Sequence, residues 1–294
     1  MMFSNTQYRD IIICNRFKLK YTFRHKNVKF ESFWRSYRLL FCYNISRMSD
    51  IIEGRNTVVE SLRAGRPINR VLLSRNIQRH SVIAEILRLS REQGIPVEYV
   101  DDKAIEKYSI TSASQGVIAL AAAMEYISLD DLLKLTRDKN EPALYCILDG
   151  IEDPQNLGAI IRTADAAGVH GIIVRTRRAA GLTAVVAKVS AGAIEYVPVA
   201  RVSNIAQSLE ILKIAGVWTI GVDMHGSQDY TKVDYKVPIA LVIGGEGKGV
   251  SELVRKRCDI LARIPMKGHL NSLNASVAAA LVMYEAYRQR AAIK

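Results

Sequence analysis

The sequence predicts a two-domain α/β protein whose larger part is built on a mostly parallel sheet. Short and almost wholly apolar runs such as 143–149 and 239–244 are typical of strands that are buried on both faces. Segments with apolar residues at helical spacing alternate with these runs. Loops rich in Gly, Asn and Ser follow several runs, and open α/β sheets bind ligands beyond the carboxyl ends of their strands. At 294 residues the chain is long enough for two cores.

Residues 1–47 differ in composition from the rest of the chain. All six Phe lie here, and residues 1–48 carry ten Lys or Arg against two acidic residues. The segment has neither helical nor strand periodicity, so we expect it to be disordered or poorly packed. It could be a basic RNA-binding arm, a targeting peptide, or an upstream extension that is not part of the working protein. The change of pattern at Met48 favours the last of these.

The composition as a whole favours a polyanionic partner and argues against a metal. Lys and Arg outnumber Asp and Glu by 41 to 29. The first 48 residues hold +8 of the net +12, so charge alone is weak evidence for nucleic acid. Four Cys without a CxxC pair and five His without an HExxH pattern predict no metal site and a reducing, cytoplasmic location. No apolar run is long enough to span a membrane, so we expect a soluble protein.

Residues 48–125 are expected to form a small α/β module. Gly65 and Gly94 follow helix-period segments and are typical of helix ends. A charged linker ending in proline, within 126–142, then separates this module from the larger domain, 143–294. The elements expected in the module are a helix at 56–64, a strand at 70–73, a helix at 81–93, a strand at 96–100, a helix at 103–109 and a strand at 116–122.

The larger domain is expected to alternate strands and helices after a short helix that begins near Ser128. The apolar segment after Ser276 has helical periodicity and predicts a C-terminal helix. The other expected elements are strands at 143–149, 171–174, 217–223 and 239–244, with helices at 157–167 and 205–215. This order predicts a parallel sheet covered on both faces.

Three loops that follow strands or precede helices carry candidate functional groups. In LDGIEDPQNLGAIIR, a polar loop after a strand leads to Asn156 and Arg162 on the first turns of a helix. In IGGEGKG, glycines that permit positive φ and close backbone approach to a ligand surround Glu246. This loop is not a phosphate-binding P-loop, which needs Ser or Thr after GK, nor a GxGxxG dinucleotide motif. In IPMKGHLNSLNAS, Ser272 and Asn274 lie at a helix N-terminus.

The segments NLGAIIRT, IGGEGKG and IPMKGHLNSLNASVA, in this order, resemble the three signature motifs of the SpoU (TrmH) family of RNA ribose 2′-O-methyltransferases. The resemblance covers 143–294, and the module beginning at IIEGRNTVVESL resembles the RNA-binding substrate domain of that family. It implies a SPOUT-type parallel sheet with a C-terminal trefoil knot, which periodicity alone would not predict. It also implies S-adenosyl-L-methionine as cofactor and a homodimer. The implied catalytic residues are Asn156, Arg162, Glu246, Ser272 and Asn274, and the implied cofactor contacts are Gly244, Ile264 and Leu273.

The two-domain layout is most similar to family members that methylate a guanosine of 23S ribosomal RNA. The alternatives are a tRNA ribose, the ribosomal site whose methylation gives antibiotic resistance, or a non-catalytic RNA-binding assembly factor. Because a guanidinium is a poor base, we expect Arg162 to clamp the neighbouring phosphate and the developing oxyanion. RNA contacts are expected from four arginines of the small module, Arg55, Arg70, Arg75 and Arg79.

Overall fold

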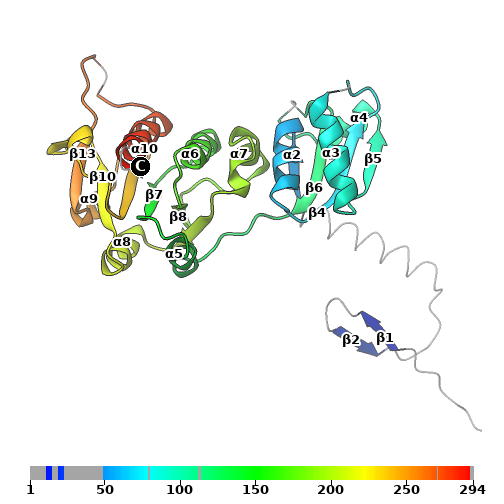
Figure 1. The fold of residues 1–294 in the computed structure, drawn as a ribbon, viewed down its shortest axis with the longest axis horizontal. Helices are drawn as coiled ribbons and strands as arrows, with labels where there is room; N and C mark the ends of the chain where they lie inside the picture. Colours follow the sequence, from blue (N-terminus) through cyan, green and yellow to red (C-terminus); the bar gives the residue numbers. More distant parts are fainter. Residues whose placement is uncertain are drawn as a thin grey trace, which may run out of the picture. The chain divides into compact units, whose positions relative to one another are not determined.

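The computed structural model describes residues 11–14, 19–22, 49–78, 80–111, 114–269 and 271–291 (Figure 1). The chain divides into two units, Met1–Met48 and Ser49–Lys294. In the first unit, strands β1 (Ile11–Cys14) and β2 (Leu19–Thr22) pair antiparallel. The remainder of the basic extension expected at 1–47 lies outside the described residues.

The N-terminal domain of the second unit is a four-stranded mixed sheet with helices on both faces. Its strand order is β3-β6-β4-β5, in which β6 runs antiparallel to both of its neighbours and β5 is parallel to β4. Every element expected here is present within two residues of its expected bounds, and β3 is an additional strand. The elements are β3 (Ser49–Glu53), α2 (Arg55–Arg63), β4 (Ile68–Ser74), α3 (Ser81–Glu92), β5 (Val97–Val100), α4 (Asp102–Tyr108) and β6 (Val117–Ala122).

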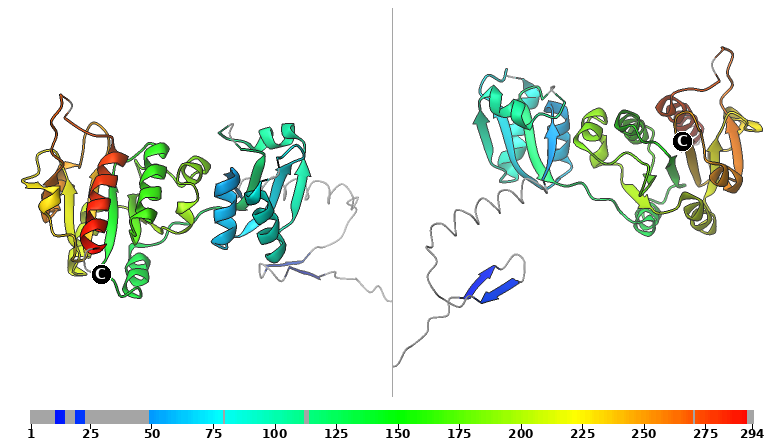
Figure 2. Two further views of the ribbon diagram at one scale, coloured as in Figure 1. Left: turned by 45° about the horizontal axis from the view of Figure 1, so that its top comes forward. Right: turned by 180° about the vertical axis from the view of Figure 1, so that it is seen from behind.

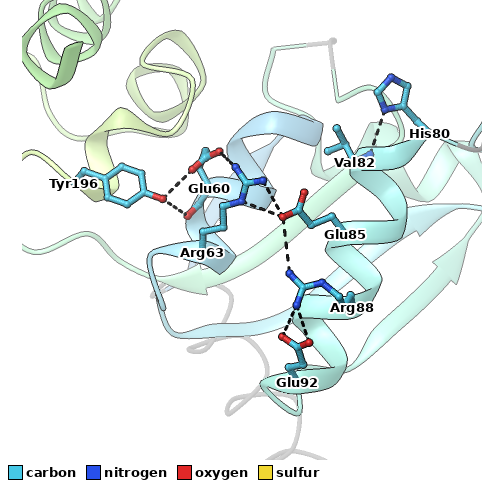
Figure 3. Close-up of polar contacts among 8 residues, drawn as sticks. All are labelled: Glu60, Arg63, His80, Val82, Glu85, Arg88, Glu92 and Tyr196. Atoms are coloured by element: carbon cyan, nitrogen blue, oxygen red, sulfur yellow. Dashed lines mark hydrogen bonds and ion pairs between the residues drawn. The ribbon is translucent and has the colours of Figure 1, made fainter.

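Alternation along β4 explains how this small sheet buries both faces. Val71 and Leu73 pack in the core formed with α2 and α3, whereas Leu72 packs in a second cluster with Ile105 of α4. Successive side chains of a strand point to opposite faces, so one strand serves both clusters. His80 caps the N-terminus of helix α3, since its Nδ1 accepts the backbone N–H of Val82 at 3.3 Å (Figure 3).

The larger domain is a seven-stranded sheet in which all pairings are parallel, as the sequence predicts. The strand order is β11-β13-β10-β12-β7-β8-β9. The helices and 3-10 turns are α5 (Leu129–Arg137), α6 (Pro154–Ala166), α7 (Ala184–Val189), η1 (Ala193–Glu195), α8 (Ile205–Ile214), η2 (Tyr230–Lys232), α9 (Glu252–Arg257) and α10 (Ala275–Ala291). The strands are β7 (Leu144–Asp149), β8 (Gly171–Arg175), β9 (Val199–Val202), β10 (Trp218–Val222), β11 (Gln228–Asp229), β12 (Ile239–Gly244) and β13 (Ile260–Arg263).

Helices cover both faces of this sheet (Figures 1 and 2). The alternate residues Leu144, Cys146 and Leu148 of β7 belong to the core that includes α6, α7 and α10. Tyr145 and Ile147 belong to the opposite core, which includes α5 and α8. Strand β7 is therefore apolar from Leu144 to Leu148, which is why its sequence predicts a strand that is buried on both faces.

Two glycines are required where backbone segments of this domain pass in contact. A Cβ on Gly244, at the end of β12, would lie 2.0 Å from the carbonyl carbon of Gly249. A Cβ on Gly226, after β10, would lie 2.5 Å from the carbonyl carbon of Ala262 in β13. No other residue type fits either position without moving the backbone. The trefoil knot implied by the family resemblance stays a prediction.

The two domains of the second unit meet through polar contacts between α2 and the segment around η1. The guanidinium of Arg66 donates to Glu195 Oε1 at 2.9 Å, and the Ser61 hydroxyl donates to the same oxygen at 2.7 Å. The Arg66 and Glu195 side chains are only 7% and 4% exposed. Both partners are therefore buried, and the contact joins residues 129 positions apart.

An exposed network extends this junction along the N-terminal domain (Figure 3). The Tyr196 hydroxyl donates to Glu60 Oε2 at 2.8 Å, and Arg63 bridges Glu60 and Glu85. Burial, together with the hydrogen bond and negative charge of Glu60, raises the pKa of Tyr196 to about 12. Tyr196 therefore stays protonated and remains a donor at physiological pH.

Candidate active site

Three side chains from distant loops form a hydrogen-bonded triangle at one end of the parallel sheet. Glu246 Oε1 accepts Nδ2 of Asn156 at 2.8 Å and Nδ2 of Asn274 at 3.0 Å. Nδ2 of Asn274 also donates to Oδ1 of Asn156 at 2.9 Å. The three residues lie up to 118 positions apart in the chain. Fold topology, and not local sequence, therefore brings them together.

The glycine loop that carries Glu246 is tied to the end of β7. Gly245 N donates to the backbone oxygen of Asp149 at 2.9 Å, and Gly249 N donates back to Gly245 O at 3.0 Å. Gly247 and Gly249 have φ values of +77° and +60°, which glycine adopts without strain. These values confirm the expectation that glycines of this loop adopt positive φ.

The other expected role of the glycines, close approach to a ligand, has a different explanation at two positions. Gly244 makes room for Gly249, and a Cβ on Gly245 would lie 2.2 Å from the carbonyl oxygen of Gly150. The loop folds against itself and against the β7 end, so these glycines first serve backbone packing.

A buried carboxylate fixes the loop ends relative to each other. Asp149 is 4% exposed, and its Oδ2 accepts the backbone N–H of Ser251 at 2.8 Å. Its Oδ1 accepts Arg175 of β8 at 3.1 Å. Asp149 therefore connects the ends of two strands with the start of α9. Sequence reasoning placed Asp149 only at a strand end and missed this role.

Helix capping positions both asparagines of the triangle. Asp153 caps α6, since its Oδ1 accepts the backbone N–H of Gln155 at 3.0 Å. The helix therefore begins at Pro154, three residues earlier than the sequence predicts, and Asn156 lies in its first turn. Asn274 caps α10, since its Oδ1 accepts Ser276 N at 2.9 Å. The Oδ1 atom of Asn274 faces its own helix, so its amide nitrogen is the group that meets Glu246.

Two of the expected catalytic residues make no hydrogen bond within the triangle. Arg162 is exposed and follows Asn156 by six residues on α6, a rise of about 9 Å along the helix axis. Within the part of the chain that the structure describes, neither Arg162 nor Ser272 makes a side-chain hydrogen bond or ion pair. Glu246 contacts Asn156 and not Arg162, so Arg162 remains available for a substrate.

Of the positions expected to contact a cofactor, Gly244 lies at the end of β12, and Ile264 and Leu273 lie in the loop between β13 and α10. Ile264 packs partly buried against the core, and Leu273 is 37% exposed. Two further exposed apolar side chains lie nearby, Met266 in this loop and Met224 in the loop after β10. The described residues of 264–273 make no backbone hydrogen bond to other described residues. Free backbone groups beside apolar side chains suit a purine nucleoside.

The arginines expected to contact RNA have partners within the N-terminal domain. Arg55 donates to the backbone oxygen of Gln115 at 3.2 Å. Arg70 pairs with Glu98 at 3.3 Å and Arg75 with Asp101 at 3.7 Å, both in exposed positions. Exposed pairs of this kind are weak, so RNA phosphates can compete for these arginines. The fourth arginine, Arg79, lies outside the described residues.

No group of three or more His, Cys, Asp or Glu side chains is placed to hold a metal ion within the described ranges. Within the same ranges, no helix combines the length and apolar character that crossing a bilayer demands.

Family comparisons match both domains. Residues 143–284 match the SpoU rRNA Methylase family, and residues 51–127 match the family described as RNA 2′-O ribose methyltransferase substrate binding. YacO of Bacillus subtilis (strain 168), named as a TrmH family tRNA/rRNA methyltransferase, is 47% identical over 246 residues, which are 84% of this chain and 98% of YacO. The chain belongs to the SpoU (TrmH) family.

Solved structures of family members share the fold. AviRb, a SpoU methyltransferase from Streptomyces viridochromogenes solved in complex with AdoMet, matches with a TM-score of 0.71 and 29% identity over 84% of this chain and 92% of AviRb. An AdoMet-bound rRNA methyltransferase from Sinorhizobium meliloti matches with a TM-score of 0.68 and 28% identity over 83% and 88% of the two chains.

Proposed function

We propose that this SpoU-family protein methylates a ribose 2′-hydroxyl of RNA with S-adenosyl-L-methionine as methyl donor. The observation that carries the proposal is the triangle of Asn156, Glu246 and Asn274, which joins the three motif loops in one site. The AdoMet-bound relatives and the match of the N-terminal domain to an RNA 2′-O ribose methyltransferase substrate-binding family support it.

The residues around the β13–α10 loop suit this methyl donor. Backbone groups near Gly244 and Ile264, with the exposed side chain of Leu273, would hold it. Bound there, S-adenosylmethionine would supply an electrophilic methyl group, carried on a sulfonium that can leave with the bonding electron pair.

The side chains of this protein are proposed to position the ribose and to stabilise charge. Glu246 uses Oε1 for both amides, and its Oε2 accepts no hydrogen bond from the described residues, so this oxygen can accept one from the substrate. Asn274 and Ser272 orient the hydroxyl, and the permanently charged Arg162 clamps the neighbouring phosphate and the developing oxyanion.

For the RNA target, we propose a guanosine of 23S ribosomal RNA, the substrate of the RlmB type within this family. The separate substrate-binding domain and the rRNA methyltransferase from Sinorhizobium meliloti favour this choice. A tRNA ribose is the second candidate, because the name of YacO covers both tRNA and rRNA. A non-catalytic assembly factor is disfavoured, since such a protein has no need of an intact catalytic triangle.

We also propose how the chain is divided and assembled. Residues 48–125 form the RNA-binding domain with Arg55, Arg70, Arg75 and Arg79 as contacts, and residues 143–294 form the knotted methyltransferase domain. The connecting segment 126–142 was expected to be a linker, but its helix α5 packs into the core of the larger domain. A stripe of apolar side chains on α10 is proposed as the homodimer face, because a lone surface helix does not need it. The stripe contains Val277, Leu281, Tyr284 and Tyr287, which are 37–49% exposed.

Methyl transfer to RNA from a strain lacking the gene tests the proposal. Tritiated S-adenosylmethionine is supplied with purified 23S RNA or with bulk tRNA, and the labelled nucleoside is mapped by mass spectrometry. We expect one ribose-methylated guanosine in 23S RNA. Label in tRNA alone would select the second candidate, and absence of label in both, without cofactor binding, would leave the assembly factor. Arg162→Lys is expected to lower turnover strongly, and near-full turnover with unchanged RNA affinity would remove Arg162 from the site.

A further inference from the structure

A cleft of about 780 Å³ adjoins the catalytic triangle and contains cations that the proposed chemistry does not use. Asn156 and Glu246 line it, and so do Arg178, Lys248 and Arg255. We propose that Arg178, Lys248 and Arg255 form a phosphate subsite that holds the RNA backbone beside the ribose to be methylated. This inference rests on the proposed function and assigns part of the substrate to a defined surface.

The pairing of charges in the cleft leaves these three cations available. Asp149 is neutralised by Arg175 at 3.1 Å, and Glu252, which also lines the cleft, is paired with Lys256 at 2.7 Å. By contrast, Arg178, Lys248 and Arg255 make no side-chain hydrogen bond or ion pair with any residue that the structure describes. Three cations without partners in one cleft favour an anionic ligand.

Three acidic residues of the cleft have no cation partner among the described residues: Glu246 is held by the amides of Asn156 and Asn274, and the other two lie along one segment. Glu152 and Asp153 both belong to the loop between β7 and α6, whereas the three free cations come from the turn after β8, the glycine loop and α9. A phosphate is therefore expected on the side of the cations, and the two carboxylates disfavour a second anion along the β7–α6 loop.

The placement of the cations connects the subsite to the reacting ribose. Lys248 follows Glu246 by two residues in the same short loop. A phosphate held by Lys248 therefore belongs to the nucleotide that faces the triangle or to its neighbour. The methyl donor is not the expected anion, because Gly244, Ile264 and Leu273 do not line this cleft.

The backbone at Arg178 supports a functional role for this side chain. Arg178 has φ +56°, a left-handed conformation that is strained for a residue with a Cβ. Glycine would adopt it freely, yet this position holds an arginine. Strained backbone of this kind concentrates at functional sites. The strain allows a direct test, because Arg178→Gly removes the charge without removing a favourable backbone contact.

The experiment measures RNA affinity of the full chain against salt concentration. Filter binding with radiolabelled 23S RNA gives log K against log [KCl] for the wild type and for Arg178→Gln/Lys248→Gln/Arg255→Gln. The matched control is Lys232→Gln/Lys236→Gln/Arg257→Gln, which lowers net charge equally at exposed positions that do not line the cleft. We expect the slope of log K against log [KCl] to be less negative by roughly 2 in the cleft variant, about 0.7 for each lost phosphate contact. The cleft variant should also bind RNA at least about tenfold more weakly near 0.15 M salt. The control is expected to change the slope by much less.

Further readouts separate this inference from the proposed function. S-adenosylmethionine affinity, measured by calorimetry, should be the same in the cleft variant and the wild type. Arg178→Gly should unfold at a temperature no lower than that of the wild type and still bind RNA more weakly. If the cleft variant matches the control slope while the wild type methylates RNA, the phosphate subsite is wrong and the function stands. If the wild type neither binds the methyl donor nor labels RNA, the function itself fails.

Discussion

Removing the guanidinium of Arg66 tests the buried junction between the two domains. Arg66→Met keeps most of the side-chain volume but leaves Glu195, which is 4% exposed, with only the Ser61 hydroxyl as a described partner. The substitution also removes the bonds of Arg66 to Asp50 and to the backbone oxygen of Ala122, both at 2.8 Å. A buried carboxylate without its cation is the main cost.

The expected loss of unfolding free energy is about 3–5 kcal/mol, the usual cost of removing one partner of a buried ion pair. The lost bonds give a similar figure, since a hydrogen bond to a charged group contributes about 1.5–3 kcal/mol. Arg66→Met combined with Glu195→Gln should recover about 1–3 kcal/mol of this loss, because the double variant no longer buries an unpaired charge.

Equilibrium urea unfolding followed by circular dichroism measures these differences for both single variants and the double variant. Arg63→Met is the control, because Arg63 bonds Glu60 and Glu85 in the same region but is 46% exposed, so its removal should change the midpoint little (Figure 3). A loss below about 1 kcal/mol for Arg66→Met, or strict additivity in the double variant, would show that this pair does not hold the junction.

Three further predictions concern the larger domain. Burial, together with the positive charges of Lys139 and Arg290, lowers the pKa of His170 below 6.5, so the folded state favours the neutral imidazole. The free energy of unfolding should therefore fall as the pH drops below about 6.5. In His170→Gln, the urea midpoint should decrease less between about pH 7 and pH 5 than it does in the wild type. Gly244→Ala should abolish methyl transfer, because its Cβ would overlap Gly249, whereas Gly247→Ala, with open space and φ +77°, should cost only about 1–2 kcal/mol in thermal unfolding. Leu281→Arg should convert a dimer into monomers in sedimentation velocity, and an unchanged dimer would place the interface elsewhere.

Strong periodicity made most elements predictable from the sequence. Strands β7 and β12 are nearly continuous apolar runs, and their placement in a parallel sheet was predicted correctly. Strand β9 (VARV) and strand β13 (ILAR) were missed, because four residues carry too little pattern to be distinguished from a loop. Helix α7 was missed for a similar reason, as AVVAKV is too short to show a helical face.

The site was predictable as residue types in loops, but not as a set of contacts. Asn156, Glu246 and Asn274 were identified from their motifs, and their convergence depends on strand order, which no local pattern encodes. Arg178 gave no signal, because its left-handed backbone is visible only in the structure. The role of Asp149 was equally hidden, since both of its partners are distant in the sequence.

Asn274 both begins the last helix and completes the triangle, and this affects when the protein can become active. The cap of α10 and the bonds to Asn156 and Glu246 use the same amide group, so the two form together. Residues of α10, including Val282 and Met283, also complete the core that holds α6 in place. During synthesis, a nascent chain therefore has no assembled triangle until almost its whole length has been made.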